Sequence, residues 1–397
     1  MPRNQSRRDF LKTSVALAGA QFLAAPTILA DKSPNSKLGV AVVATGGMGG
    51  YSVRAGLNER VVAMVDVDEG KLREGLKAAD KKGQKPDTYH DYRKMLDAQK
   101  GVDVVLIATP DHNHAPAAIR AIKRGKHVFV QKPMAHNIYE CYALSKAAKE
   151  NKVLTQMGNQ GHCGENIRQV CEHIWAGSIG DVTETHSLLG RNFGGKGGRP
   201  KSKPVPGGLH WDEWLGPAPH REYHDGLHTF GWRSWRPFGT GTIGDMACHN
   251  VDTLFWALKI AEAKTYTVEC LNTKNGSEER WTQDNVVRYE IPARAGMPPV
   301  TVYVYDHKGL RPDVMKEAET KHKFEFKECT LFSGKKGQLR IQGHSGRWNF
   351  LPSEKAKEIK TPDKTIARAH GGPIEDLFWA IKNDGTPCSN FPGAAGP

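Results

Sequence analysis

Residues 104–135 read VVLIATPDHNHAPAAIRAIKRGKHVFVQKPMA, and this stretch decides the fold. Val104–Ala108 is an apolar, β-branched run with the length of a strand buried on both faces. Thr109-Pro110 ends that strand, because proline cannot donate to a sheet and restricts the residue before it. Ala115–Lys123 then predicts a helix and His127–Val130 a second strand. A strand, a helix and a strand at this spacing form a βαβ unit of a parallel sheet.

Open parallel sheets bind their ligands at the carboxyl ends of the strands, and Gln131-Lys132-Pro133 stands at such an end. A lysine held there by a following proline is a candidate for chemistry. The stretch TPDHNHAPAAIRAIKRGKHVFVQKP closely resembles the central block of the Gfo/Idh/MocA oxidoreductases, which use NAD or NADP on sugars and polyols. The usual block ends in Glu-Lys-Pro. Here Gln131 removes the charge beside the lysine but keeps a hydrogen-bonding side chain of similar length.

A glycine-rich turn, TGGMGG at 45–50, follows the strand predicted at Leu38–Ala44. Aligned to G-x-G-x-x-G, its three positions are Ala44, Gly46 and Gly49, so the fingerprint is imperfect at its first position. Gly46 would let the backbone approach a pyrophosphate, and Gly49 would let the helix pack closely on the strand. Free N–H groups and the helix dipole favour phosphate there. The cofactor-binding residues predicted in this turn are Gly46, Gly47, Met48 and Gly49.

A second strand, Val61–Val65, ends at Asp66, twenty residues after Gly46. A carboxylate at this place accepts hydrogen bonds from an adenosine ribose and repels a 2′-phosphate. NAD is therefore favoured over NADP. The alternative is that Asp66 caps the helix that starts near Glu69.

His112 and His114 follow the Thr-Pro turn, where a nicotinamide cofactor passes. A metal site is the alternative, because H-x-H occurs in such sites, but no carboxylate-rich set of partners accompanies the pair. No metal is predicted. Asn159 follows the strand predicted at Val153–Met157 and is expected to close the cofactor cleft. The predicted cofactor-binding set is completed by Thr109, Pro110, Gln131 and Lys132.

The segment GDMACHNVD at 244–252 begins a helix that is predicted to run to Leu258, with Asp245 as its cap. Asp245 and His249 are four residues apart and share one helical face. A carboxylate beside an imidazole orients it and raises its basicity, as general base catalysis requires. The alternative is a capping Asp and a buried His. Gfo/Idh/MocA members have the same Asp-x-x-x-His arrangement, and the resemblance implies that Lys132, Asp245 and His249 are catalytic.

The expected fold class is α/β, with an N-terminal Rossmann dinucleotide-binding domain (31–157) and a C-terminal α+β domain with a large, mostly antiparallel sheet (158–397). Residues 191–241 are rich in Gly, Pro, Trp and His and lack periodicity, which in a compact domain indicates a functional segment or an interface. His228 and Arg233 are its candidates for substrate binding, together with Lys132, Asp245 and His249. The alternative is that its aromatic residues form a satellite core or an oligomer interface.

The first thirty residues resemble an export signal peptide. SRRDFLK at 6–12 is a twin-arginine export motif, and a mild apolar stretch follows to Ala30. A basic helix start or a membrane anchor is the alternative. Twin-arginine export carries folded proteins, so a periplasmic or otherwise extracytoplasmic enzyme is expected to hold its cofactor tightly and recycle it. The resemblance also implies a further helix and strand beyond residue 397, without which a sheet edge would be unpaired.

Composition sets limits on function. The 397 residues carry a net charge of +13, yet no basic run interleaved with aromatics indicates nucleic-acid binding. The body of the chain has no apolar segment of membrane-spanning length. The seven cysteines form no CxxC pair, so they are expected to be mostly free and buried.

The leading hypothesis is an NAD-dependent oxidoreductase that transfers hydride from a sugar or polyol carbinol. The alternative hypothesis is an NAD-dependent glycosidase or lyase that uses the same residues. In such an enzyme, transient oxidation of a sugar hydroxyl acidifies a neighbouring C–H, and a glycosidic group is then eliminated. A third is a non-catalytic sugar-binding relative, which Gln131 supports best. A homo-oligomer through the C-terminal sheet is expected, with one face of that sheet on the first domain and the other on a partner subunit.

Overall fold

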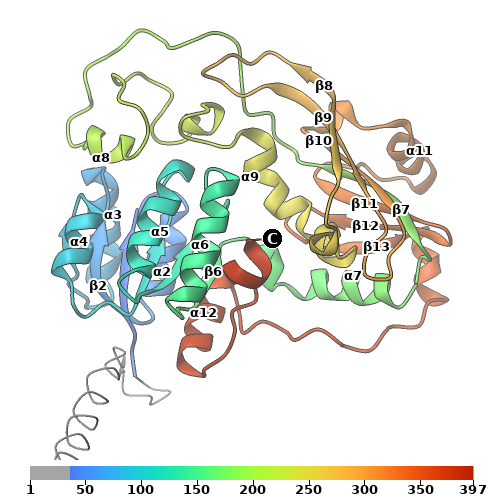
Figure 1. Ribbon diagram of the computed structural model, residues 1–397, viewed down its shortest axis with the longest axis horizontal. Helices are drawn as coiled ribbons and strands as arrows, with labels where there is room; N and C mark the ends of the chain where they lie inside the picture. Colours follow the sequence, from blue (N-terminus) through green and yellow to red (C-terminus); the bar gives the residue numbers. More distant parts are fainter. Residues whose placement is uncertain (1–35, 397) are drawn as a thin grey trace, which may run out of the picture. The chain divides into compact units, whose positions relative to one another are not determined.

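A six-stranded parallel sheet with the order β3-β2-β1-β4-β5-β6 forms the first half of the structure, which is a computed structural model that describes residues 36–396 (Figure 1). The strands are β1 (Gly39–Val43), β2 (Arg60–Val65), β3 (Asp87–Tyr89), β4 (Val104–Ile107), β5 (His127–Val130) and β6 (Thr155–Met157). The helices between them are α2 (Gly49–Gly56), α3 (Glu69–Asp80), α4 (Tyr92–Ala98), α5 (His114–Ile122) and α6 (Ile138–Glu150). The export motif and Ala30 lie outside the described residues.

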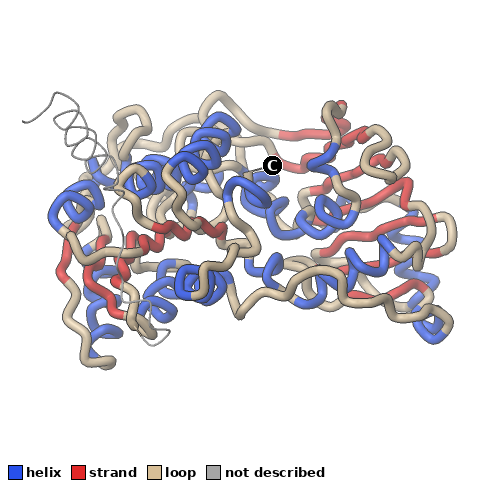
Figure 2. Tube along the Cα trace, turned by 60° about the horizontal axis from the view of Figure 1, so that its bottom comes forward, coloured by secondary structure: helices blue, strands red, loops and turns tan. Residues whose placement is uncertain are grey.

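Two hydrophobic cores cover the two faces of this sheet, as the helices flanking the strands in Figure 2 illustrate. One core lies under α4, α5 and α6 and includes Met95 and Leu144. The other lies under α2, α3 and α12 (Pro373–Lys382) and includes Val53 and Leu377. The central strands β1 and β4 are buried at every residue between these layers, because both faces of a parallel sheet are covered by helices.

A seven-stranded sheet with the order β13-β12-β11-β7-β10-β9-β8 forms the second half. Only the β7–β10 pair is parallel among its described neighbours. The strands are β7 (Val182–Leu188), β8 (Thr267–Lys274), β9 (Gln283–Ile291), β10 (Val300–Tyr305), β11 (Cys329–Gly334), β12 (Gly337–Gln342) and β13 (Trp348–Leu351). The helices are α7 (Glu165–Trp175), α8 (Trp211–Leu215), α9 (Gly241–Asn250), α10 (Asp252–Ala257) and α11 (Asp313–His322). The predicted fold class is confirmed.

The C-terminal segment returns to the first half of the chain (Figure 1). Phe391 is completely buried in the core under α5 and α6. The backbone N–H of Met157 in the edge strand β6 donates to the Ser389 carbonyl at 3.0 Å, and the N–H of Phe391 donates to the Thr155 hydroxyl at 3.0 Å. The edge at β6 is therefore covered by residues 389–391 rather than left unpaired.

The elements β3, β13 and α11 are absent from the sequence expectations, and so are the helices α6 and α8. The first two are strands of three and four residues, too short for a periodic pattern. The third, DVMKEAETKH, has few apolar residues. From Lys37 onward the chain forms one compact unit. No helix in the described part of the chain is both long and apolar enough to cross a membrane.

Candidate active site

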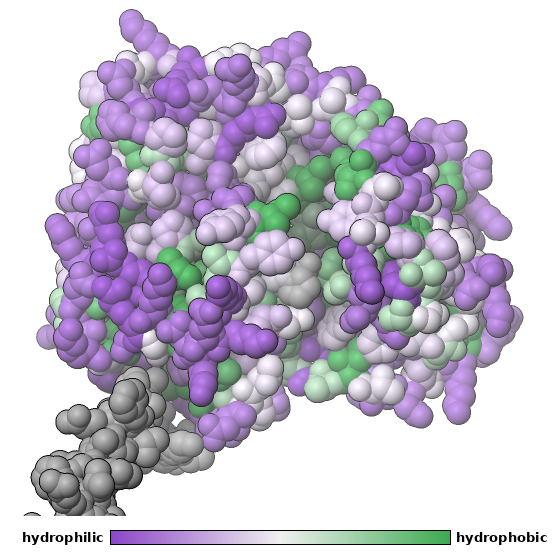
Figure 3. All heavy atoms as spheres, in the orientation of Figure 1, coloured by the Kyte–Doolittle hydropathy of each residue, from purple (hydrophilic) through white to green (hydrophobic). Residues whose placement is uncertain are grey.

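A cavity of about 1170 Å³ lies at the carboxyl ends of β1, β2, β4 and β5 and is bounded on its other side by the second half. On the face shown in Figure 3 the surface is hollowed between the two halves, and apolar side chains gather in the hollow. The sequence-predicted residues that line the cavity are Gly46, Gly47, Met48, Asp66, Thr109, Pro110, Gln131, Lys132, His228, Arg233, Asp245 and His249. Those that do not line it are Gly49, His112, His114 and Asn159.

The glycine-rich turn presents its backbone to the cavity. Among the described residues, no hydrogen bond occupies the N–H groups of Gly47 and Met48, which precede α2. These groups and the amino terminus of α2 suit a phosphate. Gly49 acts behind the turn: a Cβ there would lie 2.1 Å from the Ala44 carbonyl oxygen. Gly49 therefore allows the close helix–strand packing on which the turn depends.

Asp66 is bound to the turn itself. Its Oδ2 accepts hydrogen bonds from the Thr45 N–H at 2.7 Å and the Gly46 N–H at 3.3 Å. Its Oδ1 accepts from the Asp68 N–H at 2.9 Å. Asp68 is the cap of α3, and its Oδ1 accepts from the Gly70 N–H at 2.8 Å. The capping alternative for Asp66 is therefore wrong, and Asp66 braces the turn from the cavity wall.

Several buried polar groups on the cavity wall have no hydrogen-bond partner in the described chain. Two of them are the Asn113 Oδ1 and Arg120 Nε atoms, and the other three lie just after β4 or β5 or on α9. These three are the Thr109 hydroxyl, the Gln131 side-chain amide and the His249 Nδ1 atom. Unpaired buried polar groups are costly, so they indicate a ligand that completes them. Together with the glycine-rich turn, these groups would suit a bound dinucleotide.

His112, His114 and Asn159 hold the structure around the cavity. The two histidines are buried, and all four ring nitrogens face main-chain carbonyls: those of Phe238 and Trp214 for His112, and those of Pro133 and Thr109 for His114. Burial lowers the pKa of each to about 4. The Asn159 side chain bonds Asp252 and Ser389. Their polar atoms are used inside the protein, which explains why none of them lines the cavity.

A charged cluster of Lys132, Arg233 and Asp245 lies at the end of β5. The Lys132 Nζ donates to the Asp245 Oδ1 at 3.0 Å and to its main-chain carbonyl at 2.9 Å. The Arg233 Nε donates to the same Oδ1 at 3.2 Å, and its guanidinium stacks on Phe230 and Trp232. One carboxylate thus accepts hydrogen bonds from two cations, and the cluster has a net positive charge.

Two predictions about Asp245 are wrong, and so is the expected extent of its helix. The helix α9 begins at Gly241, so Asp245 lies in its second turn and does not cap it. The expected single helix is also interrupted at Val251, between α9 and α10. Asp245 binds Lys132 and Arg233 rather than orienting His249, because a carboxylate binds cations more strongly than a neutral imidazole.

His249 is a neutral imidazole. Burial, together with the neighbouring Lys132 and His344, lowers its pKa to about 2. Its ring lies 3.9 Å from the ring of His344, centroid to centroid. His344 follows β12, lines the cavity and has its Nε2 3.1 Å from the Glu328 carboxylate. Sequence analysis missed His344, because a histidine in a turn between two short strands has no distinguishing pattern.

Asp111 was also missed. Its carboxyl is buried, lines the cavity and accepts a hydrogen bond from the Thr240 hydroxyl at 2.8 Å. Burial, together with the nearby Asp245, raises the pKa of Asp111 to about 7. Its place directly after Thr109-Pro110, at a strand end, was the available signal.

Residues 191–241, the cover segment, extend from the second sheet across the first half to α8 (Figure 1). The aromatic residues in it mainly form a satellite core, as the alternative interpretation has it: Trp211, Trp214, Tyr223, Trp232, Trp235 and Phe238 are buried together. Trp214 and Trp232 line the cavity as well. The His228 Nε2 lies 2.8 Å from the Asp68 Oδ2, so His228 binds the nucleotide half at the far end from Lys132.

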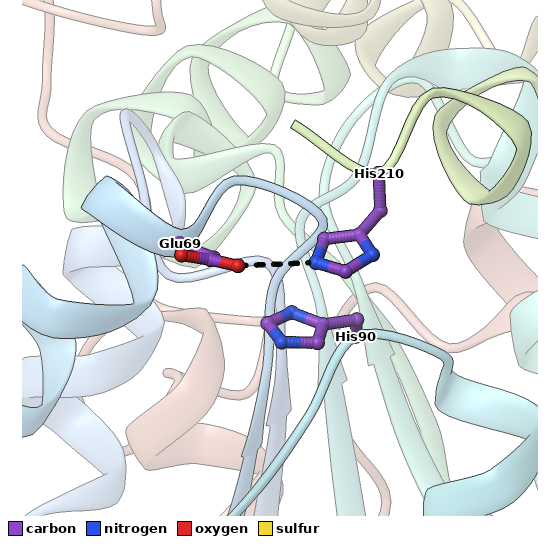
Figure 4. Close-up of side chains that lie close together, drawn as sticks. All are labelled: Glu69, His90 and His210. Carbon is purple, nitrogen blue, oxygen red and sulfur yellow. Dashed lines mark ion pairs between the residues drawn. The ribbon is translucent and has the colours of Figure 1, made fainter. Parts of the chain in front are cut away.

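A second contact of the cover segment lies beside this one. The His210 ring stacks on the His90 ring at 3.8 Å between centroids, and its Nε2 lies 3.5 Å from the Glu69 Oε1 (Figure 4). The His210 N–H donates to the Val67 carbonyl at 2.8 Å. The cover segment is thus joined to the loop after β2 by both side chains and backbone.

Comparison with known proteins agrees with this architecture. The family description "Oxidoreductase family, NAD-binding Rossmann fold" matches residues 38–159, and "Oxidoreductase family, C-terminal alpha/beta domain" matches residues 190–288. Both descriptions belong to one family, and together they cover more than half of the chain.

Individual relatives match over part of their length. Inositol 2-dehydrogenase 1 of Saccharopolyspora erythraea is 32% identical over 154 residues, 38% of this chain and 44% of that protein. A glycosyl hydrolase family 109 protein of Solibacter usitatus is 30% identical over 205 residues, 45% of this chain and 44% of that protein. The chain therefore matches less than half the length of these curated relatives.

Solved structures share the fold at low sequence identity. Levoglucosan dehydrogenase in complex with NADH and levoglucosan has a TM-score of 0.57 and 18% identity, over 90% of this chain and 93% of that chain. An aldose-aldose oxidoreductase from Caulobacter crescentus has a TM-score of 0.57 and 16% identity, over 91% and 94%.

Proposed function

The chain belongs to the Gfo/Idh/MocA family of oxidoreductases and has its NAD-binding domain, and from this we propose that it oxidises a secondary alcohol of a sugar or polyol. The observation that carries the proposal is the charged cluster of Lys132, Arg233 and Asp245 beside His249. It lies at the carboxyl edge of the nucleotide-binding sheet, next to the unpaired Gln131 amide.

Lys132 is the group that binds the reacting oxygen. An ammonium has three donors, and two of them are used by the Asp245 carboxylate and carbonyl. The third is left for a substrate hydroxyl. The net positive charge of the cluster stabilises negative charge that develops on that oxygen in the transition state.

His249 takes the hydroxyl proton on a ring nitrogen. The lowered pKa keeps the imidazole neutral, and its Nδ1 atom has no hydrogen-bond partner among the described residues, so a ring nitrogen is available to accept the proton. NAD supplies the acceptor for the carbinol hydride when bound, and Arg233 holds Asp245 so that Lys132 keeps its position.

The test is the Lys132→Met variant with Lys149→Met, an exposed lysine on α6, as a matched control. A carbohydrate panel that reduces the cofactor in the parent protein should give turnover at least 100-fold lower in Lys132→Met. Lys149→Met should match the parent. The cofactor content of both should be unchanged, measured by absorbance after acid extraction. Full turnover in Lys132→Met would refute the assignment.

A second candidate function has a specific observation in its favour, namely the similarity to the glycosyl hydrolase family 109 protein over 205 residues. The same groups would oxidise a sugar hydroxyl transiently, after which the acidified neighbouring C–H allows a glycosidic group to leave. Water addition and re-reduction complete the cycle without net use of NAD. Release of an aglycone from a glycoside panel with no added NAD would favour this function over net oxidation.

We further propose that the protein is exported and that it retains NAD tightly. The motif SRRDFLK at 6–12 supports export, and the cover segment supports retention, because its contacts to Val67, Asp68 and Glu69 lie across the far end of the cavity. In cell fractionation, an Arg7→Lys/Arg8→Lys double variant should accumulate in the cytoplasm because it is not exported. Denatured protein should release close to stoichiometric dinucleotide. Protein that releases none and binds none from solution would overturn the proposal.

We also propose that the protein forms a homo-oligomer through its second sheet. Strand β8 is exposed along most of its length, including Val268 and Leu271, and exposed apolar residues on a sheet indicate an interface. Light scattering should show a homo-oligomer that a Val268→Lys substitution dissociates. A monomeric parent protein would contradict this proposal alone.

A further inference from the structure

Two cysteines far apart in the sequence lie together behind the cavity. Cys163 ends the short helix η2 (Gln160–Cys163), and Cys388 lies in the segment after α12. They are 225 residues apart, and their sulfur atoms are 2.9 Å apart. The Gln156 Nε2 donates to both sulfur atoms, at 3.5 and 3.4 Å.

Rigid neighbours hold both sulfur atoms in place. The Cys388 N–H donates to the buried Asp376 Oδ2 at 2.8 Å. The next residue, Ser389, is bound by its N–H to the Gln156 Oε1 at 2.9 Å. Gln156 belongs to β6, so the pair is fixed between a central sheet and the C-terminal segment. Two thiols held at this separation need no backbone rearrangement to react with each other.

The surroundings shift the pKa values of the two thiols in opposite directions. The hydrogen bond from Cys163 lowers the pKa of Cys388, and burial opposes this, while His162 and Gln156 lower it further. The same contact raises the pKa of Cys163. Cys388 is therefore the thiol of the pair that ionises more readily, and it is assigned as the nucleophile.

We propose that Cys163 and Cys388 are a redox pair that closes to an intramolecular disulfide when the protein meets a small disulfide oxidant. The Cys388 thiolate attacks one sulfur of the oxidant and expels its other half as a thiolate. Cys163 gives its proton to solvent and attacks the Cys388 sulfur, which expels the second half. Two protein thiols are oxidised and one external disulfide is reduced to two thiols.

The bond would fasten the C-terminal segment to the edge of the nucleotide-binding sheet. A crosslink over 225 residues constrains the unfolded chain strongly, so the closed form should melt at a higher temperature. It should also protect residues 383–396 from proteolysis. This inference does not depend on the proposed hydride chemistry, and a failed activity assay leaves it intact.

The experiment uses the full-length protein, equilibrated with oxidised or with reduced glutathione. Peptide mapping without reductant should find the Cys163 peptide linked to the Cys388 peptide only after oxidation, together with a higher melting temperature. Cys163→Ser and Cys388→Ser should each lose both effects. Cys270→Ser, which removes the exposed cysteine of β8, should keep both. Mapping of the parent protein decides the question even where a variant folds poorly.

Two outcomes would overturn the proposal. One is that both thiols stay open to alkylation after exposure to oxidised glutathione. The other is that they are blocked by a metal and are freed by a chelator, because the two sulfur atoms and an Asp376 carboxylate oxygen lie within 4.8 Å of one another. A zinc-dependent block would assign the cluster to metal binding instead.

Discussion

Side chains of the second half contact the nucleotide half at two places around the cavity, the reacting end beside Lys132 and the far end beside Asp68, and the surroundings of these two places differ. At the reacting end, the Lys132 and Asp245 side chains are only 12% and 7% exposed. At the far end, His228 and Asp68 are 19% and 24% exposed, and His210 and Glu69 are 34% and 44% exposed. Buried charges depend on their partners far more than exposed ones. The reacting end should therefore be rigid and costly to disturb, and the far end should open at small cost.

Asp245→Asn tests the reacting end and should have the largest effect. It leaves the Lys132 and Arg233 cations side by side without their carboxylate. We expect the free energy of unfolding to fall by about 3–5 kcal/mol, the usual loss for breaking a buried pair. Turnover should fall at least 100-fold. Urea denaturation and steady-state kinetics measure the two effects, and Asp68→Asn at the far end is the matched comparison. Equal losses in the two variants would contradict the difference between the ends.

The two ends also differ in how far their residues and contacts could be predicted from the sequence. Lys132 was predictable, because a strand followed by Lys-Pro fixes its place at a sheet edge. The pairing of His228 with Asp68 was not, because 160 residues separate them and the cover segment has no periodicity. The partners of Asp245 were missed for a related reason: local spacing pointed to His249 on the same helix, whereas a tertiary contact brought in two cations.

Asp111→Asn tests how burial sets charge beside the cluster. The folded pKa of about 7 lies above the unfolded value of about 4, so the native state binds more protons between these two pH values. Stability from this group is fully present below pH 4 and is lost as the pH rises to about 7. One pKa unit corresponds to about 1.4 kcal/mol, which bounds the effect at about 4 kcal/mol.

The variant should remove this dependence and be more stable than the parent at pH 8. Melting temperatures from pH 5 to pH 8 measure it, with the exposed Asp80→Asn as the control. Parallel pH profiles in the parent and Asp111→Asn would show that Asp111 titrates normally.

His228→Ala tests the far end through cofactor release. It removes the contact to Asp68, a partly exposed pair for which about 1 kcal/mol is the usual upper value, so dissociation of NAD should be up to about fivefold faster. Burial alone would raise the pKa of Asp68, but the hydrogen bond from His228 lowers it, so the contact should weaken as acid protonates Asp68. Dissociation is measured by displacement of bound cofactor. His220→Ala, an exposed histidine of the same segment, should release NAD at the parent rate.

His210→Ala should have the smallest effect, below about 1 kcal/mol in the free energy of unfolding, because its side-chain contact with Glu69 is partly exposed to solvent. The backbone bond from the His210 N–H to Val67 remains in the variant, so turnover should not change. The nitrogen and oxygen atoms of Glu69, His90 and His210 also lie within 4.8 Å of one another. The two rings meet face to face (Figure 4), however, and their nitrogens would have to turn to share an ion. Added Zn²⁺ should therefore leave the melting temperature of the parent unchanged; a rise that His210→Ala abolishes would make the far end a metal-held closure.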